Sequence, residues 1–240
     1  MGSTYRSTTS DRHNDRMAVA ARAISDTSAQ WEIMGSLNEA IRRPLTLDVS
    51  SLPSVAFGHR NTTWLANVFY MAIEGMMFAL MFATYFYLRT RSTDWPPGHL
   101  PPAIRYGALN AVVFLLSIAP AWWVRRRAPD GDRRAVRNGL LVLSLFALAA
   151  TAFRVLEFTT LNCRWSDDAY SSTIWVLIGM HSGHLVTELI ETLVLLAISF
   201  TPKMEGTRLA DAAINSDYWY FVVVTGLMVD FLIYGTTRFL

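Results

Sequence analysis

The segment Ser171–Phe200 reads SSTIWVLIGMHSGHLVTELIETLVLLAISF, an apolar stretch that contains four ionisable residues, His181, His184, Glu188 and Glu191. A transmembrane helix needs about 20 mostly apolar residues, so this segment is long enough to cross a bilayer. At about 100° per residue the four ionisable side chains fall within an arc of about 80°, on one face of the helix. Ionisable groups at membrane depth are costly and almost always face the interior of a bundle. We therefore expect this face to be covered by protein.

Four other segments have the length and apolarity of a membrane span. They are Trp64–Leu88, Tyr106–Val124, Asn138–Phe158 and Tyr218–Thr237. The composition agrees, because 52% of the residues are hydrophobic, only 17% are charged, and the apolar residues are grouped in long blocks. The sequence therefore predicts an all-α fold, an integral membrane bundle of five transmembrane helices within residues 61–240.

Arginine is concentrated in one connection, Arg125–Arg137, which holds six arginines in thirteen residues. Cytoplasmic loops carry an excess of Lys and Arg, so we place this connection in the cytoplasm. The N-terminal residues and the Thr201–Asp217 loop then lie on the same side, with fifteen basic residues inside, five outside and Arg154 embedded. This distribution predicts a cytoplasmic N-terminus and a periplasmic C-terminus. The APDGD run at Ala128–Asp132 predicts a turn.

Residues 1–60 form a polar N-terminal extension that lacks the apolar core of a signal peptide. One interpretation is a flexible tail. The other is an amphipathic helix over Met17–Arg43 that docks on a partner or on the bilayer surface.

Four charged residues lie in the other predicted spans: Glu74, Arg154, Glu157 and Asp230. Glu74 is near the middle of its span, where it either hydrogen-bonds a neighbouring helix as a neutral carboxyl or takes part in proton movement or lipid contact. Arg154 and Glu157 are three residues apart, a spacing that favours a local ion pair. Asp230 has no partner nearby in the sequence, so we expect its partner on another helix.

The spacing of His181, His184 and Glu188 allows metal ligation, and a di-metal carboxylate site in the membrane is one hypothesis. However, Glu191 lies about 15 Å along the helix axis from His181, so the four residues cannot form one site. The sequence has no second Glu-x-x-His motif. We therefore expect no metal site here, and we expect hydrogen bonds between helices instead.

The histidine and cysteine contents argue against redox catalysis by this chain alone. Only His181 and His184 lie at membrane depth, and two histidines three apart on one helix cannot ligate a haem from both sides. The single cysteine, Cys163, excludes a site that needs two thiolates from this chain. No basic face with interleaved aromatic residues is present, so we expect no nucleic-acid partner.

Seven stretches, in the same order, resemble subunit III of the haem-copper cytochrome c oxidases, in its short form with five spans. The stretches are AIEGMMFALMFATYFY around Glu74, DWPP at Asp94–Pro97, LNAVVFLLS at Leu109–Ser117, PDGDRR at Pro129–Arg134, Leu156–Phe158, SDDAYSSTIWVLIGMHSGH at Ser166–His184 and YWYFVVV at Tyr218–Val224. The chain differs from the family pattern at Tyr220, Val223 and Gly226, where family members usually carry His, Asp and Trp.

The resemblance implies a non-catalytic, multi-pass subunit of the bacterial inner membrane that packs against subunit I and other oxidase subunits and holds structural phospholipids. Haem and copper are then expected in partner subunits and no cofactor in this chain. In that family the subunit sustains proton uptake and protects the active centre during turnover. The resemblance makes Glu74, Glu157, His181 and His184 the candidates for proton or lipid function.

The remaining polar residues of the spans are expected to make structural contacts between helices. They are Arg154, Glu188, Glu191 and Asp230. Two other functions stay open. One is a subunit III-like partner of a bacterial nitric oxide reductase, and the other is an independent membrane metalloenzyme that uses His181, His184 and Glu188.

Overall fold

The structure, a computed structural model, describes residues 8–42, 56–58 and 61–239. The chain divides into two units, Met1–Leu52 and Pro53–Leu240. The first unit contains helix α1, Thr8–Arg42. Those α1 side chains that the structure describes are exposed, and Trp31 and Ile33 project about 160° apart around the helix axis. Helix α1 covers Met17–Arg42 of the predicted helix and Arg43 lies outside the described residues, and docking of this helix on a partner or on the bilayer surface stays a prediction.

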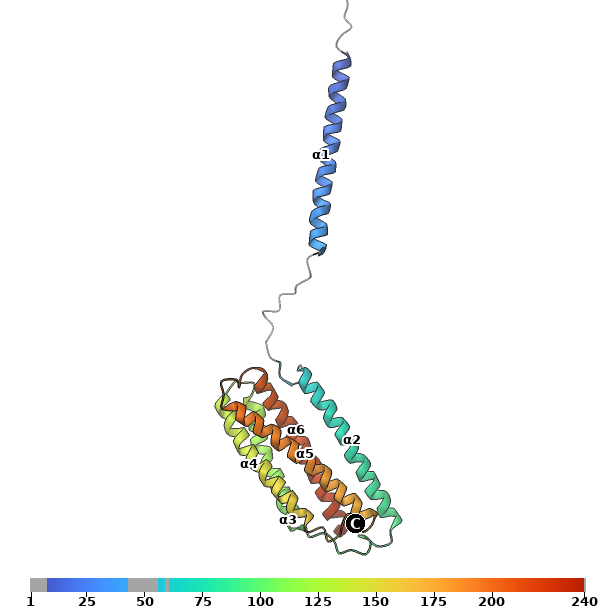
Figure 1. The fold of residues 1–240 in the computed structure, drawn as a ribbon, viewed down its shortest axis with the longest axis vertical. Coiled ribbons are helices and arrows are strands. Elements are labelled where there is room, and N and C mark those ends of the chain that lie inside the picture. The colour runs from blue at the N-terminus through green and yellow to red at the C-terminus, as the bar shows by residue number, and fades with distance from the viewer. Residues whose placement is uncertain (1–7, 43–55, 59–60, 240) are drawn as a thin grey trace, which may run out of the picture. The chain divides into compact units, whose positions relative to one another are not determined.

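The second unit is a bundle of five long helices (Figure 1), each long and apolar enough to cross a membrane. They are α2 (Thr62–Arg91), α3 (Ile104–Arg127), α4 (Arg133–Phe158), α5 (Ala169–Ser199) and α6 (Thr207–Asp230). The last span continues from α6 through a π-helical turn, η2 (Phe231–Gly235), into α7 (Thr236–Phe239). No strand occurs among the described residues. The predicted all-α fold with five spans is confirmed.

The last span begins earlier than predicted. Helix α6 begins at Thr207, so most of the predicted Thr201–Asp217 loop is helical. The segment LADAAINSD has good helix-forming residues but low hydropathy, and Leu209, Ile214 and other residues of it are buried against the bundle. Hydropathy identifies only the part of a helix that lies in lipid, which is why the sequence placed this boundary too late.

Acidic residues begin two of the helices, because their side chains accept hydrogen bonds from otherwise unpaired backbone N–H groups. Asp132 accepts from the backbone N–H of Ala135, and Gly131 with φ of 72° completes the predicted turn between α3 and α4. Asp168 accepts from the backbone N–H of Ser171. Burial raises the pKa of Asp168, but hydrogen bonds from Ser171 and His99 outweigh it and leave the pKa below its ordinary value. The Asp168 cap therefore stays charged at neutral pH.

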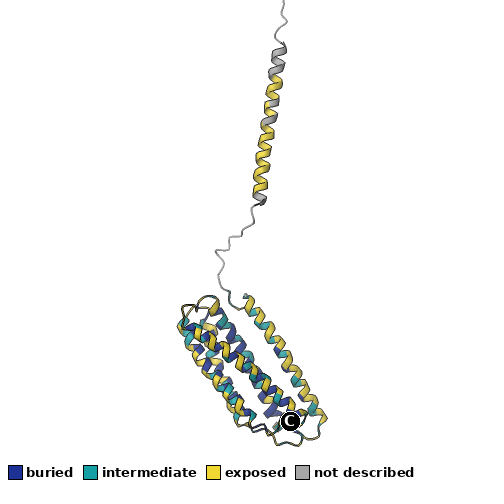
Figure 2. Ribbon diagram, in the orientation of Figure 1, coloured by how far each residue is buried: buried dark blue, intermediate teal, exposed yellow. Residues whose placement is uncertain are grey.

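Helix α6 lies at the centre of the bundle and α2 at its edge (Figure 2). In the most apolar part of each span, 61% of the residues of the last span are buried but only 11% of those of α2. Helix α3 packs on α4 and α6, α4 packs on α5, and α2 packs on α5 and α6. Polar residues on the inner faces of α2, α4 and α5 are therefore directed toward α6.

Candidate functional site

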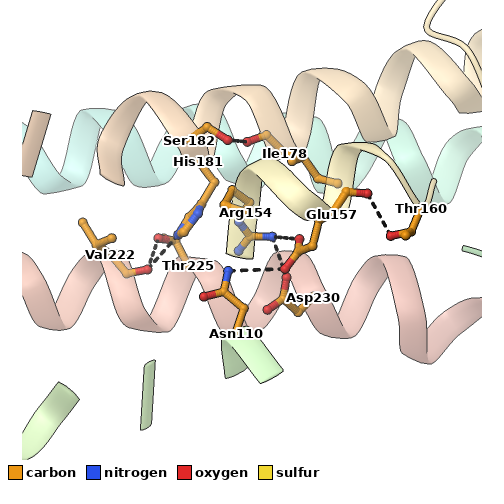
Figure 3. A network of polar contacts seen from close by, with 10 residues as sticks. All are labelled: Asn110, Arg154, Glu157, Thr160, Ile178, His181, Ser182, Val222, Thr225 and Asp230. Carbon is orange, nitrogen blue, oxygen red and sulfur yellow. Dashed lines mark hydrogen bonds and ion pairs between the residues drawn. The ribbon is translucent and has the colours of Figure 1, made fainter. Parts of the chain in front are cut away.

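Arg154 of α4 is the centre of a buried polar cluster (Figure 3). It is 1% exposed, and its Nη1 donates to Glu157 Oε2 at 2.5 Å and to Asp230 Oδ1 at 2.8 Å. Glu157 lies one turn away on α4, and Asp230 comes from the end of α6, where η2 begins. The structure thus shows the local pair expected from the sequence and gives Asp230 a partner on another helix.

Asn110 of α3 joins this cluster and donates to the Glu157 oxygen that Arg154 does not contact. Its side-chain Nδ2 donates to Glu157 Oε1 at 3.3 Å, so both oxygens of this fully buried carboxylate accept a hydrogen bond. Arg154 carries one positive charge and can neutralise only one of the two carboxylates. Burial of a net charge at membrane depth is costly, so the cluster is most stable when Glu157 and Asp230 share one proton.

His181 of α5 lies in a tightly packed site between α3 and α6. Its Nε2 donates to the backbone carbonyl oxygen of Val222 at 2.9 Å (Figure 3). The ring of Phe114 packs edge-on against the His181 ring. A Cβ atom at Gly226 would lie 2.7 Å from His181 Nε2. The absence of a side chain at Gly226 therefore creates the space that His181 occupies.

Glu74 of α2 is contacted by residues from two other helices. His184 Nε2 of α5 lies 2.9 Å from Glu74 Oε1, and the Tyr218 hydroxyl of α6 donates to Glu74 Oε2 at 2.7 Å. Glu74 is 5% exposed although α2 is the least buried span. The ring of Phe78, one turn along α2, packs against His184 at 5.4 Å between centroids. Glu74 is thus held where α2 joins the rest of the bundle.

The contacts of His184 place it where it can share a proton with Glu74. His184 Nδ1 lies 2.7 Å from the carbonyl oxygen of Met180, which only accepts, so Nδ1 carries a hydrogen. The contact between His184 Nε2 and Glu74 Oε1 also needs a hydrogen, which belongs to either the imidazolium or the carboxyl group. The pair is electrically neutral overall in both forms, as imidazolium with carboxylate and as neutral imidazole with carboxylic acid. A proton can therefore move between the two residues without leaving a net charge in the membrane.

Glu188 has a third set of partners, from α6. It is fully buried, and its Oε1 accepts from Asn215 Nδ2 at 2.5 Å. Asn215 Nδ2 also donates to Thr192 Oγ1 at 3.1 Å, which ties α5 to α6 a second time. Glu188 Oε2 has no hydrogen-bond partner. Glu191, one turn further along α5, is exposed and does not share these contacts.

His181, His184 and Glu188 contact three separate partners. His181 contacts Val222, His184 contacts Glu74, and Glu188 contacts Asn215. Among the described residues, no group of three or more His, Cys, Asp or Glu side chains is placed to hold a metal ion. These three residues share one face of α5, but each of them contacts a different position on α2 or α6.

Three contact residues were not among the candidates from the sequence: Asn110, Asn215 and Tyr218. Asn110 is an amide in a span without charge, and an uncharged polar residue in such a span is a signal that favours an interhelical hydrogen bond. Asn215 lay in a predicted loop. Tyr218 lay at the predicted end of a span, where tyrosine is common at the membrane interface and gives no signal of its own.

Comparison with known proteins places this arrangement in a family. The model of the family described as cytochrome c oxidase subunit III matches residues 54–236. The chain is 23% identical over 188 residues to a cytochrome c oxidase subunit 3 of Thermostichus vulcanus, which covers 77% of this chain and 92% of the relative. It is 26% identical over 181 residues to a probable cytochrome c oxidase subunit 3 of Mycobacterium leprae, over 72% of this chain and 88% of the relative. Because the family match spans all five long helices, the chain belongs to the cytochrome c oxidase subunit III family.

Proposed function

We propose that this chain is a non-catalytic membrane subunit of a proton-translocating haem-copper terminal oxidase in a bacterial inner membrane. The observation that carries this proposal is the family match over residues 54–236, which covers every span of the bundle. Haem and copper then belong to partner subunits. The polar residues at membrane depth support this role, because they contact one another instead of surrounding a reactive position.

The surface of the bundle supports binding to subunit I and to phospholipids. An apolar groove of about 460 Å³ between α2 and the last span has the chemistry of an acyl-chain site and is lined by Phe82, Phe86, Val224, Leu227, Met228, Phe231 and Leu232. A second pocket of about 310 Å³ contains Trp64, Trp122, Arg125 and Arg126, residue types that suit a lipid headgroup at the membrane interface. The exposed apolar face of α2 is available for lipid or for subunit I.

The charge distribution supports an N-terminus in the cytoplasm and a C-terminus in the periplasm. The Arg125–Arg137 connection defines one end of the bundle, which we call the arginine-rich end. Arg125 pairs with Asp217 and Arg133 with Glu205, so the start of α6 lies at this end too. By the positive-inside rule this end faces the cytoplasm.

Purification of the tagged chain in mild detergent tests the proposed function. We expect haem-bearing oxidase subunits to copurify with it and to show haem absorption, because a non-catalytic subunit is held in the complex by its partners. Copurification of nitric oxide reductase subunits instead would favour the reductase alternative. Stoichiometric iron or zinc on the isolated chain, lost in His181→Ala, would contradict the proposal and favour a metalloenzyme.

Glu74→Gln tests the proposed role in proton uptake. The glutamine can still accept from Tyr218 and can donate to His184 Nε2, so the helix contacts and assembly should be retained. The amide has no titratable proton to share with His184. We expect a normal amount of assembled complex that takes up protons more slowly and inactivates after fewer turnovers.

The matched control for Glu74→Gln is Glu205→Gln, the same chemical change at an exposed loop residue. Oxygen consumption should be followed until activity is lost, in the wild type and in both variants. A wild-type number of turnovers before inactivation in Glu74→Gln would show that Glu74 is a packing residue only.

A further inference from the structure

A cavity of about 120 Å³ lies between α2, α5 and α6, and it contains the two carboxylates that the proposed function leaves unexplained. It is lined by Asn67, Tyr70, Thr187, Glu188, Glu191 and Tyr218. Most of these side chains are polar, whereas the groove between α2 and the last span is almost wholly apolar. The surroundings of this cavity therefore suit water and not an acyl chain.

The unpaired oxygen of Glu188 is the strongest indication that the cavity is hydrated. Glu188 is fully buried and lines the cavity, yet its Oε2 has no partner within the protein. A buried polar atom without a hydrogen bond is destabilising, and buried water usually satisfies such atoms. At about 30 Å³ per water molecule, the cavity has room for about four.

The cavity lies on the side of the Glu74–His184 pair that faces the arginine-rich end. Asn67 is one turn beyond Trp64, which contacts Asp217 at this end of the bundle. Glu191 and Tyr70 are exposed and lie at the mouth of the cavity. The mouth of the cavity therefore opens on the outer surface of the bundle, on the side of Glu74 that faces the arginine-rich end.

Tyr218 belongs both to this cavity and to the proton-sharing pair. It lines the cavity with Glu188, and its hydroxyl donates to Glu74 Oε2 at 2.7 Å. When water delivers a proton to the Tyr218 oxygen, the tyrosine can pass its own hydroxyl proton to Glu74. The tyrosine is then neutral again, and the added proton leaves the pair with one net positive charge until the pair returns a proton to the water by the reverse steps.

We propose that the Glu188 cavity is a hydrated entry site through which the Glu74–His184 pair exchanges protons with solvent at the arginine-rich end. Glu188 holds the water in place through its free oxygen, and Glu191 attracts protons to the mouth. This inference deepens the proton role proposed for Glu74. Its test measures proton exchange without turnover, so the two proposals can fail separately.

The test is nuclear magnetic resonance of the full-length chain in lipid bilayers, with nitrogen-15 in its five histidines. The exchange of ring protons with water should be fast at His184 and slow at His181, which is fully buried outside this cavity. Glu188→Met keeps the side-chain length but removes the groups that bind water. We expect it to slow exchange at His184 about tenfold, which corresponds to about 1.4 kcal/mol in the barrier.

Ile190→Met is the matched control, because it places the same side chain on the outward face of α5. It should leave exchange at His184 unchanged. Equal exchange rates at His184 in Glu188→Met and in the wild type would overturn the proposal. If Glu188→Met does not fold, the comparison of His184 with His181 in the wild type still tests the proposal. Exchange at His184 as slow as at His181 would mean that the cavity is dry and would overturn the proposal.

A cation site is the competing explanation for two carboxylates around one cavity. Sodium or calcium chloride added to the wild type distinguishes it from a proton site. If the exchange rate at His184 is the same with sodium and with calcium, at constant ionic strength, the result supports the proposal. Exchange that is blocked by one ion, with the block lost in Glu191→Gln, would overturn it.

Discussion

Replacing Arg154 with methionine is expected to lower the free energy of unfolding by about 3 to 5 kcal/mol, the usual effect of removing one partner from a buried ion pair. Arg154 is 1% exposed and holds both Glu157 and Asp230 through Nη1. Without it, two buried carboxyl groups face each other with no positive charge. Unfolding of the detergent-solubilised chain, followed by loss of helical circular dichroism, measures the change.

The triple variant Arg154→Met, Glu157→Leu, Asp230→Leu is the control for this prediction. Replacement of a whole buried ion cluster by apolar residues is often neutral or stabilising, by about 1 to 4 kcal/mol. We therefore expect the triple variant to recover most of the stability that Arg154→Met loses. Wild-type stability of Arg154→Met would show that the cluster does not hold α4 to the last span.

Replacing Gly226 with leucine is expected to cost about 3 kcal/mol, at the upper end of the usual range for overpacking a core. A Cβ atom there would lie 2.7 Å from His181 Nε2 and 2.9 Å from Phe114 Cε2. Neither ring can move away easily, because His181 is hydrogen-bonded to Val222 and Phe114 is fully buried. The same unfolding measurement should show the loss, together with a smaller amount of assembled protein in the membrane.

Gly179→Leu is the matched control, because Gly179 is also a helical glycine but a Cβ atom added there would meet no atom within 4 Å. Glycine is about 1 kcal/mol less favourable than alanine in a helix, so this substitution should be neutral or slightly stabilising. An equal cost at both glycines would mean that contact with His181 and Phe114 does not explain the effect at Gly226.

Glycine at position 226 is matched to the position of His181. The ring of His181 occupies the space where a side chain at position 226 would lie, and it donates to the backbone carbonyl oxygen of Val222. Gly226 and the position of His181 therefore depend on each other. A change at one is expected to require a change at the other.

The sequence was sufficient to predict the number of spans and their polar residues. Hydrophobicity over about 20 residues is a local property, so five spans could be recognised without knowledge of their neighbours. The same applies to the pair Arg154 and Glu157, because residues three apart on a helix are neighbours in any fold. The orientation of the termini stays a prediction from the arginine distribution.

Only the tertiary structure decided which polar residues meet. The four ionisable residues of Ser171–Phe200 share one helix face, yet His181 bonds to Val222, His184 to Glu74 and Glu188 to Asn215. These partners are far apart in the sequence and come from two other helices. Periodicity fixes the face on which a residue lies, but the rotation and height of the neighbouring helix fix its partner, and these depend on the packing of the whole bundle.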